Sequence, residues 1–260
     1  MNPLIVIPAR YASSRFPGKP LAEIGGVPML ARTAAVARQV GPYVVATDDA
    51  RIERFCRDHG FPVVMTDPDL PSGSDRAKAA ADLFAPSANV IVNLQGDAPF
   101  TPPDYIRACL DTLGADGAAD IATPVVPLSW DALDALRDAK QETPFSGTTA
   151  IVGANGRARW FSKQIVPALR DEASLRAKGG PSPVLQHVGL YAYRRDALEH
   201  YVSLPPSPYE RLEGLEQLRA LENGLVIACA RVEPHAMSQA GIDTPEDLAR
   251  AEAKLQELGL

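Results

Sequence analysis

The sequence has few cysteines and no long apolar run. Its three cysteines, Cys56, Cys109 and Cys229, are far apart and lack the paired spacing of a zinc site or a disulfide framework, which favours a reducing cytoplasm. No segment approaches the roughly 18 consecutive apolar residues of a membrane span. The apolar run near Met1 is too short for a signal peptide and has no small-residue cleavage site. We therefore expect a cytoplasmic protein that is neither exported nor inserted into a membrane.

Positive charge is also in deficit. The chain carries 26 Lys and Arg against 32 Asp and Glu, a net charge of −6, which argues against a nucleic-acid partner held by overall electrostatics. Internal repeats, heptad arrays and low-complexity tracts are absent too. What is present is 46% hydrophobic residues over 260 positions, enough for a large buried core. Any cluster of basic residues therefore needs a local explanation.

Short apolar runs and helical patterns alternate through the first part of the chain. Strands are expected at residues 4–8, 43–47, 62–65 and 89–94, with helices at 28–40, 50–59 and 75–84 between them. This alternation predicts an α/β fold with a mostly parallel, twisted sheet flanked by helices. Because such sheets bind ligands at the carboxyl ends of their strands, residues 10–19 and 95–97 are expected beside one crevice.

The second part of the chain is less regular from about residue 121. Strands are expected at residues 121–126, 148–152, 188–193 and 225–231, with longer connections between them. Residues 167–183 contain several basic residues and two glycines, and are the expected mobile loop. We interpret this part as a continuation of the sheet with a smaller lobe for binding an acceptor and pairing subunits.

The loop after the first predicted strand is rich in cations and hydroxyls. Residues 8–20 read PARYASSRFPGKP and contain Arg10, Arg15 and Lys19. Arginine offers forked donors to phosphate oxygens, lysine offers a compact charge, and Gly18 lets the backbone approach. The glycine spacing of a Rossmann turn and the Gly-Lys-Ser/Thr ending of a P-loop are both missing. These residues are compatible both with a polyphosphate-binding site and with a solvated basic turn.

Two aspartates stand where a metal could be bound. Asp97 follows the strand at 89–94, and Asp243 precedes Thr244 and Pro245. Mg²⁺ prefers a few carboxylates together with substrate oxygens and water. Asp243 or Thr244 could also cap the helix that Pro245 begins. Residues alone therefore leave both a metal ligand and a helix cap open for Asp243.

The basic loop closely resembles the PARxxSxRxPGKPL signature of the bacterial 3-deoxy-manno-octulosonate (KDO) cytidylyltransferases, also called CMP-KDO synthetases. Further matches follow in the order of that family: ATD at 46–48, SGSDR at 72–76, NLQGD at 93–97, HVGLYAY at 187–193, LEQLR at 215–219 and GIDTPEDL at 241–248. The resemblance covers residues 5–248. It implies a single nucleotide-diphospho-sugar transferase-like domain over 1–260, with a nucleotide-binding half at about 1–120. It also implies an acceptor-binding and dimerisation half at about 121–260, and a homodimer.

The resemblance implies a role for each motif. Asp97 and Asp243 would share Mg²⁺, while Arg10, Ser13, Arg15 and Lys19 would bind the triphosphate of CTP. Ser72, Ser74 and Arg76 would contact the cytosine, with Arg76 favoured for the base and Ser74 also a plausible helix cap. The residues implied for an acidic sugar are Gln95, Lys163, His187, Tyr191, Glu216 and Gln217. A structural histidine at 187 and a solvated helix face at 216–217 are the alternatives to those last roles.

The expected reaction is in-line attack by the anomeric hydroxyl of KDO, or of a close keto-sugar acid, on the α-phosphorus of CTP. Pyrophosphate leaves, and the CMP-sugar serves lipopolysaccharide or capsule synthesis. Arg10, Lys19, Asp97 and Asp243 are the expected catalytic residues. No side chain is identified as the general base.

The sequence departs from the family pattern beside the metal and around the acceptor. Ala98 replaces a usual Glu, Lys163 replaces a usual Arg, and Gln186 replaces a frequent Arg. The residues SGTTA at 146–150 replace an Asn-Pro-x-x-Val-Lys stretch. Only arginine holds a carboxylate by two parallel hydrogen bonds, so these replacements make the identity of the acidic sugar less certain than the type of reaction. An acceptor of the nonulosonic-acid type is therefore an alternative. A catalytically weakened homologue that binds nucleotide or sugar is another. A Rossmann oxidoreductase is disfavoured by the missing glycine fingerprint.

Overall fold

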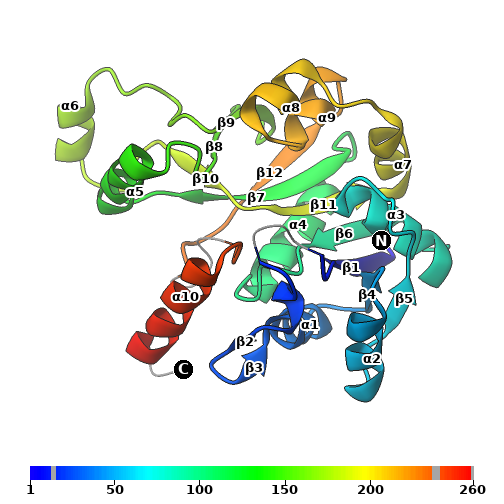
Figure 1. The fold of residues 1–260 in the computed structure, drawn as a ribbon. Helices are drawn as coiled ribbons and strands as arrows, with labels where there is room; N and C mark the ends of the chain where they lie inside the picture. Colours follow the sequence, from blue (N-terminus) through cyan, green and yellow to red (C-terminus); the bar gives the residue numbers. More distant parts are fainter. Residues whose placement is uncertain (13–15, 236–240, 259–260) are drawn as a thin grey trace. The chain divides into compact units, whose positions relative to one another are not determined.

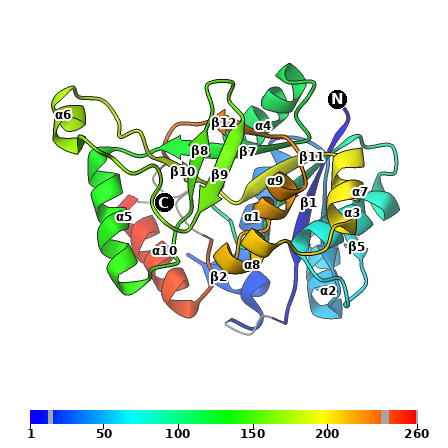
Figure 2. The same ribbon diagram turned by 90° about the horizontal axis from the view of Figure 1, so that it is seen from above.

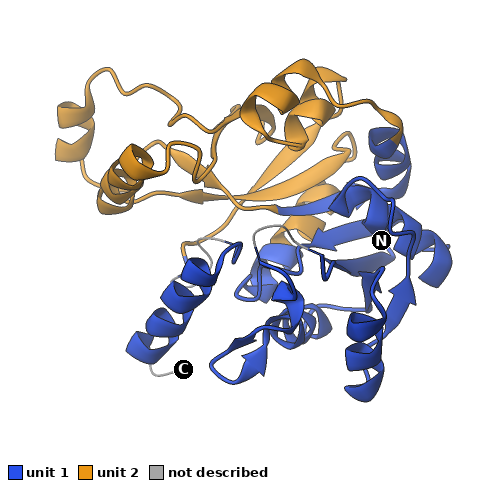
Figure 3. Ribbon diagram, viewed as in Figure 1, with its two compact units in different colours: residues 1–107, 190–202, 235–260 blue, residues 108–189, 203–234 orange. Residues whose placement is uncertain are grey.

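The computed structural model describes residues 1–12, 16–235 and 241–258, and the chain forms two compact units (Figure 3). Unit 1 comprises residues 1–107, 190–202 and 235–260, and unit 2 comprises residues 108–189 and 203–234. The chain thus leaves unit 1 and returns to it twice. As a result, the first and last parts of the sequence belong to the same unit.

Unit 1 contains a sheet whose core strands are parallel. Its strands are β1 (Pro3–Ala9), β4 (Tyr43–Thr47), β5 (Val63–Met65), β6 (Val90–Leu94) and β11 (Leu190–Arg194). They pair in the order β5, β4, β1, β6 with all neighbours parallel, and β11 joins β6 in the antiparallel direction. The residues of β1, β4 and β6 are largely buried, as expected for strands covered on both faces. The predicted α/β fold with a mostly parallel sheet flanked by helices is confirmed.

The helices of unit 1 cover both faces of this sheet. Helices α1 (Met29–Arg38) and α2 (Ala50–Asp58) lie on one face, and α3 (Gly73–Phe84) lies on the other (Figure 1). The chain runs outward from β1 through β4 to β5, and α3 then carries it back to β6 on the other side of β1. Because crossovers between parallel strands are right-handed, this reversal moves α3 to the opposite face. β1 and β6 therefore flank the switch point at which sheets of this kind bind ligands.

An apolar cluster joins the C-terminal segment of unit 1 to its first hairpin. After β1 the chain forms the short helix η1 (Lys19–Leu21) and the hairpin β2 (Glu23–Ile24) and β3 (Val27–Pro28), and it ends in α10 (Pro245–Leu258). Ile24 and Met29 pack with Ile242 and Leu255, and all four are buried. The segment around Ile242 is thereby fixed close to the residues that follow the first strand.

Unit 2 is built mainly from antiparallel strands. Its strands are β7 (Ile121–Pro127), β8 (Thr149–Val152), β9 (Ala158–Ser162), β10 (Leu185–His187) and β12 (Ile227–Arg231). β10 pairs with β7 and β8, and β8 pairs with β9, all antiparallel, whereas β12 is parallel to β7. Its helices are α5 (Trp130–Glu142), α6 (Glu172–Ala177), α8 (Pro208–Glu213) and α9 (Gln217–Glu222). Helices α4 (Pro103–Ala115) and α7 (Arg195–Ser203) each cross from one unit to the other along the chain.

The segment 167–183, expected as a mobile loop, contains a helix that is tied to α5. Glu172 of α6 accepts hydrogen bonds from Arg137, and Arg176 donates to Asp134 at 2.6 Å. The guanidinium of Arg176 also lies 4.5 Å from the centroid of the Trp130 ring. In Figures 1 and 2, α6 and α5 accordingly lie next to each other. Movement of this segment stays a prediction.

The strand expected at 188–193 forms as β11, which begins two residues later, at Leu190 of unit 1. A separate strand that the apolar pattern does not predict, β10, ends at His187 in unit 2. Val188 between them donates its N–H to the Pro124 carbonyl at 3.1 Å. The apolar pattern is continuous across a point where the chain passes from one unit to the other. The remaining expected strands form with closely matching bounds.

Over the ranges 1–12, 16–235 and 241–258, no helix combines the length and the apolar character that crossing a bilayer requires.

Candidate active site

The loop after β1 is closed by Gly18. The Gly18 N–H donates to the Tyr11 carbonyl at 2.9 Å, and Gly18 has a φ of +74°. A Cβ at this position would also lie 3.1 Å from the Tyr11 ring, so both backbone conformation and space favour glycine. The other side of the loop is held by Arg51, whose guanidinium lies 3.3 Å from the centroid of the Tyr11 ring. This closure fixes the backbone of the following residue, Lys19.

Gly96 brings the loop after β6 against β1. A Cβ on Gly96 would lie 2.5 Å from the carbonyl oxygen of Pro8, a distance that no side chain tolerates. The two strand ends can therefore approach only because residue 96 is glycine. Asp97 follows directly, and its position beside the β1 loop depends on this close approach.

Lys19 lies between the two predicted metal-binding aspartates. Its ammonium donates to Asp97 Oδ2 at 2.7 Å and to Asp243 Oδ1 at 3.0 Å. Burial works against the charge on Lys19, but the carboxylates of Asp97 and Asp243 outweigh it and raise the pKa of Lys19 above its ordinary value. Two acids and a cation that are far apart in sequence thus meet within unit 1.

A backbone hydrogen bond sets Asp243 beside Asp97. The N–H of Ile242 donates to the Asp97 carbonyl at 2.8 Å, and the Ile242 side chain is buried in the cluster with Ile24 and Met29. The packing of Ile242 therefore positions the carboxylate of the next residue.

The start of α10 is capped by Thr244. Its Oγ1 accepts from the Asp247 N–H at 3.2 Å, and the Asp247 carboxylate accepts from the N–H groups of Thr244 and Asp243 in return. Of the two capping residues left open by the sequence, Thr244 is the one used. The Asp243 carboxylate is directed to Lys19 instead.

Ser72 caps α3, which corrects the expectation for Ser74. The Ser72 Oγ accepts from the Asp75 N–H at 3.2 Å and donates to the Asp75 carboxylate. Ser74 lies inside the first turn, 2% exposed, with its Oγ 3.5 Å from Asn93 Nδ2. The helix begins at Gly73, earlier than the apolar pattern indicates, and this moves the cap back along the chain. The contacts of Ser72 and Ser74 to a base stay predictions.

Arg76 points into unit 1. Its side chain is fully buried and donates to the Asp48 carboxylate at 2.7 Å and to the Thr66 hydroxyl. Its Nε is buried and finds no hydrogen-bond partner among the described residues. Burial lowers the pKa of Arg76, and the positive charge of Arg10 acts in the same direction. The predicted contact of Arg76 to the base stays a prediction.

Arg10 follows β1 and is exposed, and its guanidinium donates to the Leu70 carbonyl. The predicted triphosphate residues Ser13 and Arg15 lie outside the described residues. Of the loop residues predicted to bind phosphate, the structure therefore places Arg10 and Lys19.

Two predicted acceptor residues belong to unit 1 and lie near α3. Gln95 Nε2 donates to Asn93 Oδ1 at 3.3 Å, and the Gln95 side chain lies against Gly73. Tyr191 stands opposite Asn93 in the pairing of β11 with β6. Its ring centroid is 5.9 Å from that of Tyr193. Gln95 and Tyr191 thus lie beside the segment predicted to contact the nucleotide base.

The other predicted acceptor residues belong to unit 2. Burial, and after it the positive charge of Lys163, lowers the pKa of His187. Gln217 is 6% exposed on α9, which packs against β9. The solvated-face interpretation is therefore wrong for Gln217, whereas the Glu216 side chain is exposed. Because the six acceptor residues are divided between the units, their union in one site stays a prediction.

Two residues that the motifs do not identify fix the backbone of Lys163. Lys140 donates to the Lys163 carbonyl at 2.6 Å and also to the Ser146 carbonyl, while Glu213 accepts from the Lys163 N–H at 2.8 Å. Glu213 also accepts from the Ser162 hydroxyl at 2.9 Å. A lysine on an amphipathic helix is usually solvated. The position of Lys140 in the sequence therefore did not predict its role in holding Lys163. Lys140 also binds part of the 146–150 segment that departs from the family pattern.

His187 is held in its neutral form. Burial, with the positive charge of Lys163, lowers its pKa from 6.5 to about 3, and its Nε2 lies 2.8 Å from the Thr123 hydroxyl. The unfolded chain takes up a proton at position 187 near the ordinary pKa, so acid favours unfolding between these two values. We expect the free energy of unfolding of the wild type to fall more steeply than that of His187→Gln as pH drops below 6.5. The excess slope is at most about 1.4 kcal/mol per pH unit.

Urea titrations at a series of pH values measure this difference. His59→Gln, which removes an exposed histidine directly after α2, is the control for the loss of an imidazole. Equal slopes for the wild type and His187→Gln would show that the folded protein does not hold residue 187 in its neutral form.

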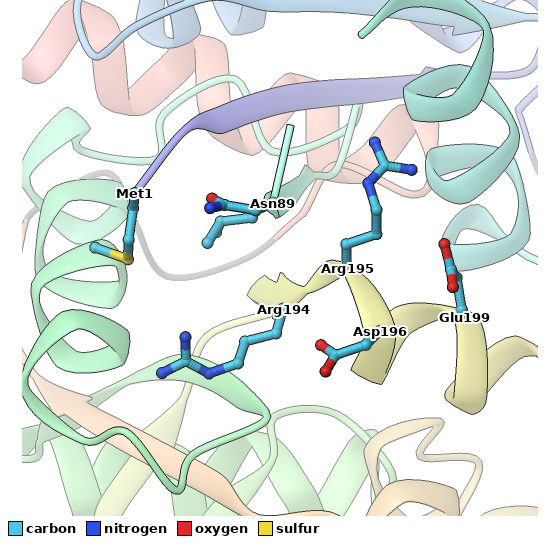
Figure 4. Close-up of a pocket in the computed structure, with 7 residues that line it drawn as sticks. Met1, Asn89, Arg194, Arg195, Asp196 and Glu199 are labelled. Carbon is cyan, nitrogen blue, oxygen red and sulfur yellow. The ribbon is translucent and has the colours of Figure 1, made fainter. Parts of the chain in front are cut away.

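A pocket of about 390 Å³ lies at the opposite edge of the unit 1 sheet, lined by Met1, Asn89, Val90, Arg194, Arg195, Asp196 and Glu199 (Figure 4). Met1 and Asn89 precede β1 and β6, so this pocket is at the amino ends of the strands that carry the loops of Lys19 and Asp97 at their carboxyl ends. Arg195 donates there to the Asp82 carboxylate and to the carbonyls of Ala85 and Ala88, which follow α3. The pocket contains none of the predicted site residues, and the candidate active site is the carboxyl edge.

Comparisons with known proteins match most or all of the chain. A family model described as "Cytidylyltransferase" matches residues 4–229. A 3-deoxy-manno-octulosonate cytidylyltransferase of Maricaulis maris (strain MCS10) is 43% identical over 257 residues, which is 97% of this chain and 96% of that protein. One of Rhodospirillum rubrum is 42% identical and covers 97% of this chain and 95% of its own length. A solved structure of CMP:2-keto-3-deoxy-manno-octonic acid synthetase complexed with CTP superposes with a TM-score of 0.85 at 35% identity and covers 100% of both chains.

Proposed function

The chain belongs to the 3-deoxy-manno-octulosonate cytidylyltransferase family, and from this premise we propose that it transfers CMP from CTP to the anomeric hydroxyl of KDO and releases pyrophosphate. The protein is an enzyme, a nucleotidyltransferase. Its proposed product, CMP-KDO, serves the synthesis of lipopolysaccharide or capsule.

One observation carries the proposal: Lys19, Asp97 and Asp243 converge at the carboxyl edge of the unit 1 sheet. The ammonium of Lys19 touches both carboxylates, at 2.7 and 3.0 Å. A cation for the phosphates and two acids for a metal are the parts that nucleotidyl transfer requires at one point. The switch point between β1 and β6 is also where a nucleotide is expected in such a sheet.

The donor set fits Mg²⁺. Two carboxylate oxygens that share one ammonium are close enough to share one metal ion, and oxygen ligands are those that Mg²⁺ prefers. Among the described residues, no three Asp, Glu, His or Cys side chains gather closely enough to hold a metal by themselves. Asp97 and Asp243 would therefore hold the ion together with phosphate oxygens and water. When bound, Mg²⁺ supplies positive charge that stabilises the α-phosphate and lowers the pKa of the attacking hydroxyl.

The residues around this point orient the reaction. Arg10 and Lys19 bind phosphate oxygens of CTP and stabilise the negative charge that grows as pyrophosphate leaves. Ser72 and Ser74, at the start of α3, are the residues proposed to contact the cytosine, and Arg76 would contact it only by leaving its buried pairing with Asp48. The attack is direct and in line, without a covalent enzyme intermediate.

The acceptor is a polyhydroxylated acid, and the proposed contacts suit it. Gln95 and Tyr191 of unit 1 offer an amide and a phenol, and Lys163 of unit 2 offers a cation for the sugar carboxylate. The neutral imidazole of His187 and the side chains of Glu216 and Gln217 complete the proposed set. Lys140 and Glu213 act on the acceptor indirectly, because they hold the backbone of Lys163.

The proposed enzyme is a homodimer of the cytoplasm. Cys56, Cys109 and Cys229 are free and buried, which suits a reducing compartment. Unit 2 exposes Phe145, Tyr209 and Leu212, and large exposed apolar side chains are typical of protein interfaces. Light scattering after gel filtration measures the mass, and that of a single chain would contradict the dimer.

An acceptor and nucleotide panel tests the proposed function. The protein is incubated with Mg²⁺, one of CTP, UTP, ATP or GTP, and one of KDO, a nonulosonic acid or no acceptor, and pyrophosphate release is measured. We expect rapid release with CTP and KDO together and little with any other pair. Faster release with the nonulosonic acid would contradict the proposed acceptor. Binding of CTP without release from any pair would show a nucleotide-binding homologue.

A further inference from the structure

The cation that joins Asp97 and Asp243 in this structure belongs to the protein itself. The Lys19 side chain is 12% exposed, and its ammonium hydrogen bonds to one oxygen of each carboxylate. The carboxylates are 30% and 41% exposed, so they open toward solvent while the ammonium lies below them. Lys19 thus occupies the position between the two acids that a shared metal ion would need.

We infer that Lys19 is a placeholder for the metal: its ammonium holds Asp97 and Asp243 together before substrate binds and leaves them for the phosphates of CTP when Mg²⁺ is bound. This inference rests on the proposed function. It assigns to Lys19 a positioning role in the free enzyme in addition to its proposed contact with phosphate.

Charge balance supports the exchange. One ammonium between two carboxylates leaves the cluster with a single negative charge, whereas removing the ammonium would leave two like charges in a partly buried site. A divalent cation in place of the ammonium makes the cluster neutral. A divalent cation and the ammonium together would give it an excess positive charge at short range. The displaced ammonium of Lys19 would then pair with the negative charge of the triphosphate.

The backbone of Lys19 is fixed, so the exchange requires only rotation of its side chain. Gly18 donates to Tyr11 at 2.9 Å, Leu21 donates to Gly18 at 2.9 Å, and Ala22 donates to Lys19 at 3.0 Å. A lysine has a flexible four-carbon stem and a compact charge, which allows its ammonium to move several ångströms about a fixed Cα. Arg10 follows the same strand and is exposed, so phosphate oxygens bound there lie on the side open to solvent.

Mn²⁺ binding in the absence of nucleotide tests the placeholder. Free Mn²⁺ is measured by electron paramagnetic resonance with the wild type and with Lys19→Met. Because Mn²⁺ must compete with the ammonium only in the wild type, we expect Lys19→Met to bind it at least about tenfold more tightly. Lys78→Met, which removes the lysine paired with Asp82 on α3, is the matched control and is expected to bind as the wild type does.

Further variants separate this inference from the proposed metal site. Asp97→Asn and Asp243→Asn in the Lys19→Met background should each abolish the tighter binding. If Lys19→Met binds Mn²⁺ no more tightly than the wild type, but Asp97→Asn still weakens that binding, the placeholder is wrong and the metal site stands. If Asp97→Asn and Asp243→Asn leave Mn²⁺ binding unchanged in both backgrounds, the proposed metal site itself is wrong.

Thermal unfolding provides a second readout. Without an ammonium between them the acids repel, so Mn²⁺ should raise the melting temperature of Lys19→Met more than that of the wild type. Lys19→Gln, which keeps a neutral donor near the carboxylates, is the second variant should Lys19→Met fail to fold. A melting temperature that rises equally in the wild type and both variants would overturn the inference.

Discussion

Asp97→Asn is expected to reduce the rate of pyrophosphate release from CTP and KDO by roughly a thousandfold, the loss that follows from several kcal/mol of transition-state charge stabilisation. The amide that replaces the carboxylate carries no charge, so the acid pair can no longer share a divalent cation. Lys19 keeps its hydrogen bond to Asp243 at 3.0 Å, and Ile242 keeps its bond to the backbone carbonyl of residue 97. The fold is therefore expected to survive the change. Initial rates at saturating CTP and Mg²⁺ measure the effect.

Asp104→Asn is the control for this variant. Asp104 is an exposed acid of the first turn of α4 that pairs with Arg107, and its replacement should leave the rate within about twofold, since exposed ion pairs contribute little. Circular dichroism and melting temperatures establish that both variants are folded. A folded Asp97→Asn enzyme with near-normal turnover would remove Asp97 from the metal site and with it the central step of the proposed mechanism.

Arg219→Met is expected to destabilise unit 2 by about 3–5 kcal/mol, the usual loss when one partner of a buried ion pair is removed. Arg219 lies on α9 and donates to both carboxylate oxygens of Glu210 on α8, at 2.5 and 2.8 Å, and both side chains are about 10% exposed. Glu210 also accepts from the Ser207 N–H in the capping box of α8. With Arg219 gone, the buried carboxylate loses both of its guanidinium hydrogen bonds. Urea unfolding at neutral pH measures the loss.

A double variant identifies the cause of this loss. Glu210→Gln combined with Arg219→Met removes the buried charge, and we expect it to recover part of the stability because a neutral amide is less costly to bury. Arg57→Met breaks the exposed pair with Glu53 on α2 and should cost no more than about 1 kcal/mol. A cost for Arg219→Met as small as that of Arg57→Met would show that the α8–α9 pair is not buried in solution.

The motif at 215–219 illustrates how structure and site share the same residues. Arg219 of this motif is a structural residue that joins α9 to α8, whereas Glu216 and Gln217 carry the proposed acceptor contacts. Likewise, Asp48 of the motif at 46–48 pairs with Arg76 of the motif at 72–76. A short string can therefore be specific for a family although only some of its members face a substrate.

The sequence alone determined the alternation of strands and helices in the first part of the chain and the loops that carry chemistry. Buried parallel strands are short apolar runs, and glycine, proline and capping residues mark their ends, so these elements depend on neighbours within a few positions. The rule that ligands lie at the carboxyl ends of such strands then placed the loops of Lys19 and Asp97 together. The family resemblance added Asp243, which no local pattern distinguishes from a helix cap.

Only the tertiary structure decided which side chains meet. Asp243 reaches Asp97 because Ile242 is buried against Ile24 and Met29, and Lys19 lies between the acids because Gly18 and Gly96 allow two loops to approach closely. The Arg76 side chain points into unit 1 because it donates hydrogen bonds to Asp48 and Thr66 there. Each of these contacts joins residues that are far apart along the chain. Their energies depend on how whole elements pack, and local sequence patterns do not contain that information.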